Sequence, residues 1–190
     1  FPEYYSRFEK AARETEGVTL TWEGHFIDPL FTHTTTGFTR PGDEEHPYLA
    51  SVSCVHDPEE EGFVQEMIMQ PEEAAKRVSA IPAGDGSFRT IPPEAFPEQV
   101  QIISRDEAGY ALQLQIGGFP FNGEEVRLAL GLPSACFELN RHGSDVRFTV
   151  RGRGHGWGLS QTEAQALAED GWSAEAILEY FYTGISFSSE

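Results

Sequence analysis

The sequence predicts an α+β protein in which short antiparallel hairpins and small sheets are combined with separate helices. Alternating apolar segments occur in pairs joined by short glycine-containing turns, which is the pattern of β-hairpins. Helical periodicity occurs in a few isolated segments and does not follow each strand in turn, so a parallel βαβ array is disfavoured. The sequence contains no internal repeat.

The composition sets the limits of size and class. The chain has 190 residues, which fits one domain of ordinary size or one with a small appended lobe. Hydrophobic residues make up 39% of it, enough for a core. The formal net charge is -18, from 31 acidic and 13 basic residues, and such a chain would repel nucleic acid. No apolar run is long enough to span a membrane.

The first expected elements are a helix and a hairpin. Residues 1–16 show helical spacing, and Gly17 is suited to end the helix. One face of this amphipathic helix would consist of Tyr4, Phe8, Ala11, Ala12 and Thr15. A strand over 18–22 and a return strand over 25–31 enclose a turn at Glu23 and Gly24.

The middle of the chain is expected to contain two strands and a helix. Residues 47–55 and 63–69 have strand-like patterns, the second typical of an edge strand. A helix is expected over 70–81, because Pro71 suits the first helical turn. Residues 82–97 are rich in proline, which indicates a surface connection with little regular structure.

The second half predicts more hairpins and three short helices. The expected strands are 101–104, 111–116, 119–121, 137–140 and 146–150. The expected helices are 122–131, 160–169 and 173–182. We expect Ser160 to cap its helix, with Glu163 completing a capping box.

The stretch RGRGHGWG has glycine at every second position from Gly152 to Gly158. Glycine permits positive backbone angles or a very close approach by another group. One interpretation is a tight packing crossover under a helix. The other is a groove for a polar ligand, with backbone N–H groups and His155 as hydrogen-bonding partners. The spacing does not match a phosphate-binding loop.

Several motifs, in order along nearly the whole chain, resemble the stage II sporulation protein D family. The run GRGHGWGLSQTEAQALAEDGWSAEAILEYFYTG resembles the C-terminal signature of that family. The segments EKAARETEGVTLTWEGHFIDPLFTHTTTGFTR, PYLASVSCVHDP and IGGFPFNGEEVRLALGLPSACFEL resemble three earlier motifs. Leu159 stands where the signature usually has Met, and Thr162 and Glu163 replace its usual Tyr-Gly.

This resemblance implies a peptidoglycan lytic transglycosylase that acts on glycan strands stripped of their peptides. Such enzymes cleave the MurNAc–GlcNAc bond and leave 1,6-anhydroMurNAc ends, during spore engulfment or cell-wall remodelling. A single glutamate acts as the general acid, which requires a raised carboxyl pKa. The alternative is a non-catalytic glycan-binding or amidase-enhancer module.

The family's acidic glutamate lies upstream of the segment that Phe1 matches, so no catalytic residue is assigned in this chain. By the resemblance, residues 1–190 form a single, N-terminally truncated domain with a small inserted lobe at about 63–135. A substrate groove is expected between the lobes. The expected location is extracytoplasmic, with a membrane anchor in an N-terminal segment absent here. Peptidoglycan glycan strands are the expected partner, together with other engulfment or cell-wall proteins.

The resemblance also places the substrate-binding residues. His155, Gly156, Ser160 and Gln161 match the signature, and Thr34 matches a second motif. The residues expected to line the glycan groove are His155, Ser160, Gln161, Gly156, Arg153, Thr34, Thr35 and Trp157. Trp157 and Trp172 are candidates for stacking on sugar rings, and Trp172 is also suited to packing against the last helix.

Two further candidates come from the residues themselves. His46, Cys54 and His56 would be the ligands of a zinc ion, although their spacing matches no closed structural site, and no other cofactor is expected. Cys54 and Cys136 either form a disulfide or remain as thiols. Arg127 is expected to form a structural ion pair.

Overall fold

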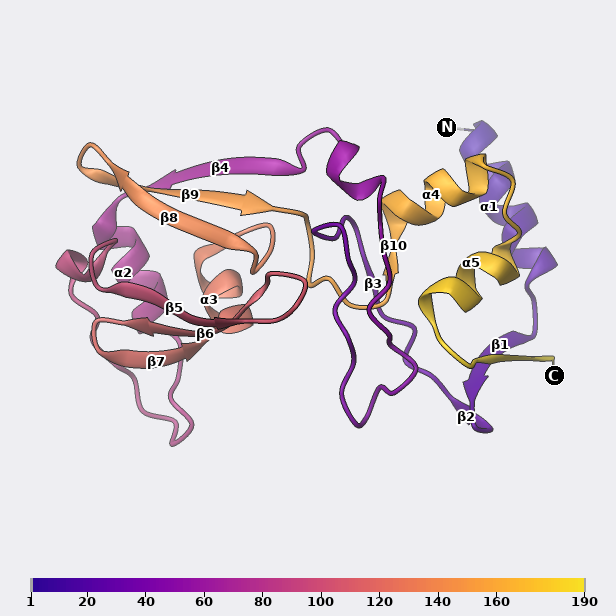
Figure 1. Cartoon of the computed structure of the whole chain (residues 1–190), viewed down its shortest axis with the longest axis horizontal. Helices are drawn as coiled ribbons and strands as arrows, with labels where there is room; N and C mark the ends of the chain where they lie inside the picture. Colours follow the sequence, from indigo (N-terminus) through magenta and orange to yellow (C-terminus); the bar gives the residue numbers. More distant parts are fainter. Residues whose placement is uncertain (1, 190) are drawn as a thin grey trace.

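The structure, a computed structural model, describes residues 2–189. Its elements form two lobes along the long axis of the molecule (Figure 1). The sheet lobe contains two three-stranded sheets and two helices, and the helical lobe contains both chain ends. This mixture of small sheets and separate helices confirms the predicted α+β class.

The sheet lobe is built from antiparallel strands and two helices that cover them. One sheet has the order β4-β9-β8, formed by Val64–Met69, Asp145–Arg151 and Phe137–His142. The other has the order β5-β6-β7, formed by Val100–Arg105, Ala111–Ile116 and Phe119–Asn122. The helices are α2 (Pro71–Ser79) and α3 (Gly123–Leu130). Its largest fully buried side chains are Phe96, Leu114, Ile116, Phe137 and Phe148.

The helical lobe has a small sheet, three helices and a short parallel pair. β1 (Val18–Trp22) lies between β2 (His25–Phe26) and β11 (Ser186–Ser189), and β3 (Phe31–Thr32) pairs in parallel with β10 (Leu159–Ser160). The helices are α1 (Pro2–Glu14), α4 (Gln161–Glu169) and α5 (Ala174–Phe181). Two short 3₁₀ turns occur at Asp57–Glu59 and Pro93–Ala95.

Two predicted strands are wrong, and two strands, β10 and β11, were not predicted. Residues 47–55 form only isolated bridges, because Tyr48, Leu49 and Cys54 are buried by packing in the helical lobe and not by a sheet. The expected strand 25–31 divides into β2 and β3, which belong to different sheets. β11 carries no clear strand signal and forms by pairing with β1.

The helix α1 confirms the predicted element, but its aromatic face is uncovered. Tyr4 and Phe8 are 68% and 74% exposed. The spacing thus predicts the helix correctly, and the face that it predicts is exposed at both aromatic residues.

The two cysteines are buried free thiols. Cys54 packs among the buried side chains of the helical lobe, and Cys136 packs with Ala108, Tyr110 and Ala135. Hydrophobic packing therefore separates them, and the question of a disulfide is resolved in favour of thiols.

Candidate functional site

The glycine segment packs very closely against other parts of the chain. Gly156 and Gly158 have φ angles of 85° and 71°. A Cβ atom on Gly158 would lie 1.8 Å from the carbonyl oxygen of Leu30, and one on Gly156 would lie 2.4 Å from the ring of Tyr110. Only glycine tolerates such contacts at such angles. The packing crossover is therefore present, and it presents Trp157 and His155 at the junction of the lobes.

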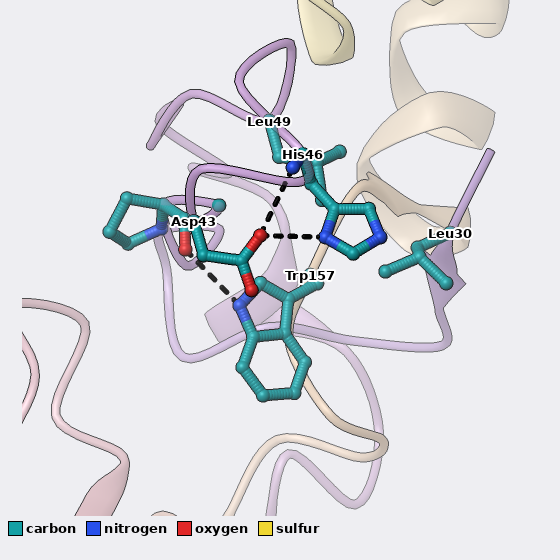
Figure 2. A pocket seen from close by; sticks show the side chains of 7 residues that line it. Leu30, Asp43, His46, Leu49 and Trp157 are labelled. Atoms are coloured by element: carbon teal, nitrogen blue, oxygen red, sulfur yellow. Dashed lines mark hydrogen bonds and ion pairs between the residues drawn. The ribbon is translucent and has the colours of Figure 1, made fainter. Parts of the chain in front are cut away.

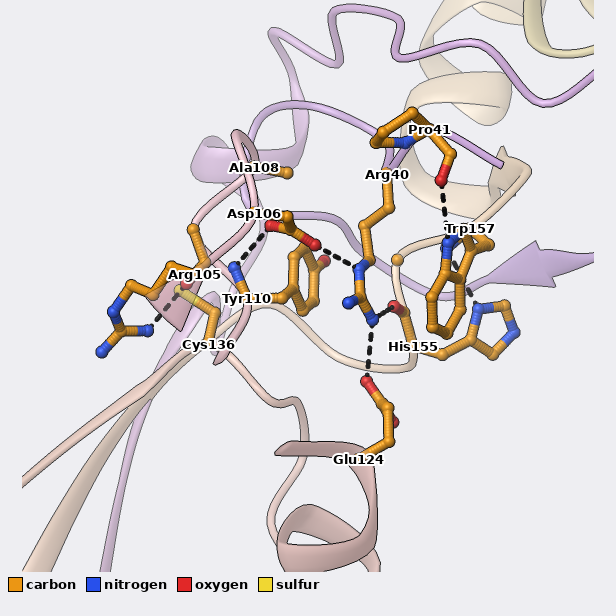
Figure 3. Close-up of polar contacts among 12 residues, drawn as sticks. Arg40, Pro41, Arg105, Asp106, Ala108, Tyr110, Glu124, Cys136, His155 and Trp157 are labelled. Atoms are coloured by element: carbon orange, nitrogen blue, oxygen red, sulfur yellow. Dashed lines mark hydrogen bonds and ion pairs between the residues drawn. The ribbon is translucent and has the colours of Figure 1, made fainter. Parts of the chain in front are cut away.

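A buried arginine ties this segment to the sheet lobe. Arg40 is 3% exposed, and its guanidinium contacts groups from three parts of the chain (Figure 3). Nε donates to Oδ2 of Asp106 at 2.6 Å, while Nη1 donates to Oε1 of Glu124 at 3.0 Å. Nη1 also donates to the carbonyl oxygen of His155 at 3.2 Å. Two carboxylates compensate the burial of this charge, which a lone arginine would not tolerate.

The same guanidinium is part of a row of stacked rings. Its central carbon lies 3.8 Å from the centroid of Trp157 and 4.8 Å from that of Tyr110. The imidazole of His155 stacks on the indole at 5.6 Å, and Figure 3 shows it on the side of the indole away from Arg40. The half-buried His155 therefore forms the outer layer of the row, and the face of Trp157 over which Arg40 lies is already covered.

The protonation state of His155 follows from its contacts. The backbone N–H of Trp157 donates to Nδ1 at 3.0 Å, so the ring proton of the neutral imidazole is on Nε2. Burial lowers the pKa of His155, opposed by the negative charge of Glu124. At neutral pH the imidazole is uncharged and acts as a hydrogen-bonding group.

Two adjoining depressions lie beside this row. One, of about 500 Å³, is lined by Leu30, Asn122, Glu124, His155 and Trp157. The other, of about 260 Å³, shares Leu30 and Trp157 and continues to Asp43 and His46 (Figure 2). There Nδ1 of His46 lies 2.8 Å from Oδ1 of Asp43, and the indole N–H donates to the carbonyl oxygen of Pro41. Together they form an open, mixed polar and apolar groove across the lobe junction, which we call the Trp157 groove.

A second buried polar cluster is centred on the carboxylate of Asp57, which is 0% exposed. Its Oδ2 accepts from the backbone N–H and the hydroxyl of Thr35, both at 2.6 Å. The hydroxyl of Ser160 lies 2.8 Å from both carboxylate oxygens. Burial raises the pKa of Asp57, while these hydrogen bonds act to lower it. This carboxylate fixes the start of α4 against the segment that contains Thr35.

Glu163 does not complete the predicted capping box. Ser160 does cap α4, since its hydroxyl accepts from the N–H of Glu163 at 3.3 Å. The Glu163 carboxylate turns to His56 instead, accepting from its backbone N–H at 2.8 Å and lying 3.1 Å from its Nδ1. Glu163 is 2% exposed, so a buried carboxylate finds two donors here where the backbone of Ser160 would offer one.

This pair makes stability depend on pH. The hydrogen bond to Glu163 raises the pKa of His56 above its unfolded value of 6.5. The stabilisation is therefore fully present below pH 6.5 and is lost as pH rises through the folded pKa. We expect the difference in the free energy of unfolding between the wild type and His56→Gln to shrink as pH rises from about 6 to about 9, each pH limit being good to about 0.5 units. Urea unfolding at each pH measures this difference. A Glu163→Gln background should abolish this trend, and its persistence there would assign it to another group.

The expected site residues divide into two groups. His155 and Trp157 line the Trp157 groove, and Gly156 lies buried between them. Arg153 and Gln161 are exposed but line neither depression. Ser160, Thr34 and Thr35 are buried, at 0–2% exposure, and their hydroxyls bond to Asp57 and Thr162. None of these three residues lines either depression. Arg40, Asp57 and Glu124 are the residues that sequence reasoning missed.

The remaining candidates have structural partners. Nε of Arg127 lies 2.7 Å from Oε2 of Glu124, which confirms the predicted ion pair. The ring of Trp172 contacts Tyr180 of α5 edge-on at 5.8 Å. Within residues 2–189, no group of three or more His, Cys, Asp or Glu side chains is arranged to hold a metal ion. His46, Cys54 and His56 have other partners, in Asp43, Val52 and Glu163, so zinc binding by this set gains no support.

The fold and site define an α+β protein with an open groove of rings, amides and carboxylates across two lobes. Comparison with curated proteins confirms the predicted resemblance to the stage II sporulation protein D family. The chain is 28% identical over 186 residues to stage II sporulation protein D of Bacillus amyloliquefaciens, covering 96% of this chain and 51% of that protein. It is 29% identical over 182 residues to the Bacillus subtilis (strain 168) protein of the same name, covering 94% and 50%.

A third relative is the amidase enhancer of Bacillus subtilis (strain 168), which is 22% identical over 232 residues, covering 97% of this chain and 33% of that protein. The chain thus spans about half or less of the length of these relatives. No family model matches the chain.

Proposed function

We propose that this chain carries the glycan-binding groove of a peptidoglycan lytic transglycosylase homologue that acts on peptide-free strands in sporulation or cell-wall remodelling. The Trp157 groove is the observation that supports the proposal most directly. It is open along its length and it lies on the segment that carries the family signature. Ring edges and faces suit pyranose C–H groups, while amides and a neutral imidazole suit hydroxyl and acetamido groups.

In this proposal the residues of the chain bind and orient the strand. Cleavage of the MurNAc–GlcNAc bond needs a protonated carboxyl beside the bridging oxygen, and the sugar 6-hydroxyl then closes the 1,6-anhydro ring. Glu124, Asp57 and Glu163 do not suit that role. Both oxygens of Glu124 are held by guanidinium groups, those of Arg40 and Arg127. Asp57 and Glu163 are buried and fully engaged. The acid belongs to the upstream segment that the resemblance implies.

The second candidate function is a non-catalytic glycan-binding module that assists an amidase. The name of the third relative favours it, as does the engagement of Glu124, Asp57 and Glu163 by other groups of the chain. Both functions use the same groove, and they differ in whether 1,6-anhydro products form.

Both functions imply an extracytoplasmic location and contact with other cell-wall or engulfment proteins. Among residues 2–189, no helix has the length and apolar character needed to cross a membrane.

The test is binding of purified peptide-free glycan strands to the chain by isothermal calorimetry, with mass spectrometry of the strands. His155→Ala should weaken binding about tenfold, since it removes the outer ring of the stacked row and a hydrogen-bond donor. His142→Ala, at the exposed last residue of β8 and outside both depressions, serves as the matched control. Equal affinities of the two variants would refute the groove as the binding site. Release of 1,6-anhydro ends by the chain alone would show that an acid within it had been overlooked.

A further inference from the structure

The Trp157 groove continues beyond Asn122 into another depression. Asn122 lines the depression that contains His155, and it also lines one of about 300 Å³ on the sheet lobe. The wall of the second depression includes Arg89, Gln113, Pro120, Phe121 and Glu125. Because the two depressions share a side chain, one strand of linked sugars can lie in both.

Arg89 is held in place by aromatic rings and keeps most of its donors free. Its guanidinium carbon lies 5.2 Å from the ring centroid of Phe121 and 5.7 Å from that of Phe119. Nη1 donates to the carbonyl oxygen of Pro120 at 2.8 Å. Within the described residues, no carboxylate forms an ion pair with it, although its charge contributes to lowering the pKa of Asp85. A planar cation that lies over aromatic rings and has no ion-paired carboxylate suits the carboxylate of a ligand.

The charge distribution singles out this arginine. The chain has 13 Lys and Arg residues against 31 acidic ones, so an anionic ligand is attracted only where a cation is locally unpaired. Eight of the cations are in ion pairs with carboxylates. The other five, all within residues 2–189, are Arg7, Lys76, Arg89, Arg105 and Arg153. Of these, only Arg89 lines one of the depressions described above.

We propose that Arg89 forms a subsite that binds the carboxylate of an acidic sugar, the lactyl ether group of muramic acid, on a strand lying in the Trp157 groove. The subsite rests on the proposed function and adds to it a basis for specificity. It distinguishes strands that alternate acidic and neutral sugars from strands of N-acetylglucosamine alone. A neutral strand leaves the guanidinium exposed to water and gains nothing from it.

Glu125 allows a second test of the same subsite, because its charge is opposite to that of Arg89. Its carboxylate lines the depression and repels an anionic sugar. Removing that charge should strengthen binding of acidic strands, whereas removing Arg89 should weaken it. A purely structural role for either side chain would affect acidic and neutral strands alike.

The experiment compares peptide-free glycan strands with chitooligosaccharides of the same length, by calorimetry at low salt. We expect the wild type to prefer the acidic strands. Arg89→Gln should reduce that preference about tenfold and leave chitooligosaccharide binding unchanged. Glu125→Gln should increase it. Arg7→Gln, which removes an unpaired exposed cation on α1, is the charge-matched control, and circular dichroism verifies that each variant folds.

The outcomes separate the two proposals. If Arg89→Gln behaves as Arg7→Gln, or if the wild type binds both ligands equally, the subsite is refuted while the glycan groove stands. If the wild type binds neither ligand, the proposed function fails and the subsite fails with it. A preference that persists unchanged in 1 M salt, roughly a 3 Å screening length, would also contradict a charge-based subsite.

Discussion

Replacing Arg40 with Met should lower the free energy of unfolding by about 3 kcal/mol or more, because it leaves partly buried Asp106 and Glu124 without their shared cation. In a chain of this size that corresponds to a fall in Tm of about 10 °C. Trp157 also loses the guanidinium that lies over its ring. Urea unfolding followed by tryptophan fluorescence measures the effect.

Arg40→Lys tests whether the charge of Arg40 alone accounts for this stability. It keeps the charge but loses the planar contact with two rings and the fork that reaches Asp106 and Glu124 together. We expect an intermediate loss of stability. A cost below about 1 kcal/mol for Arg40→Met would show that solvent compensates the two carboxylates and that the lobes do not depend on this contact.

Replacing Asp57 with Ala should cost about 3 kcal/mol, because the buried N–H and hydroxyl of Thr35 and the hydroxyl of Ser160 lose their acceptor. The effect should have a definite pH dependence. Burial raises the pKa of Asp57, so the folded state holds the proton more tightly than the unfolded chain does. The contribution of that titration is fully present below the unfolded pKa of 3.8 and is lost as pH rises through the folded pKa.

The wild type should therefore gain stability relative to Asp57→Ala as pH falls from about 7 towards about 4. This range covers about three pH units above the ordinary pKa of an aspartate. Chemical unfolding of both proteins across this range measures the difference. A difference that shrinks as pH falls would mean that the hydrogen bonds from Thr35 and Ser160 dominate over burial and depress the folded pKa. Asp57→Asn separates charge from shape in the same assay.

Local patterns in the sequence predict the elements that depend on local interactions. The helices α2 to α5 and the hairpin of β8 and β9 follow from periodicity, capping residues and glycine turns. The strand β11 could not be predicted in this way, because it pairs with β1 over 160 residues away. The strand prediction for residues 47–55 was wrong for a related reason. Its apolar side chains are buried by tertiary packing, which produces the same alternation without a sheet.

The site residues also divide into those that the sequence predicts and those that it does not. His155 and Trp157 stand out in the sequence because glycines surround them. Arg40 could not be predicted as a hub, since its partners Asp106 and Glu124 lie 66 and 84 residues away and only folding brings them together. Asp57 did have a signal, because it closes the motif PYLASVSCVHDP. A polar residue fixed at the end of an apolar motif is a reason to expect a buried hydrogen-bond acceptor.

The two separated thiols give the protein a built-in reporter of local opening. Burial raises the pKa of Cys54 to about 12 and also raises the pKa of Cys136, so neither sulfur is a ready nucleophile while its surroundings stay packed. Each becomes reactive only when its own part of the molecule opens. Alkylation kinetics at the two positions therefore measure separately how often the helical lobe and the lobe junction open. Ligands that clamp the groove should slow the reaction of Cys136, beside Tyr110, more than that of Cys54.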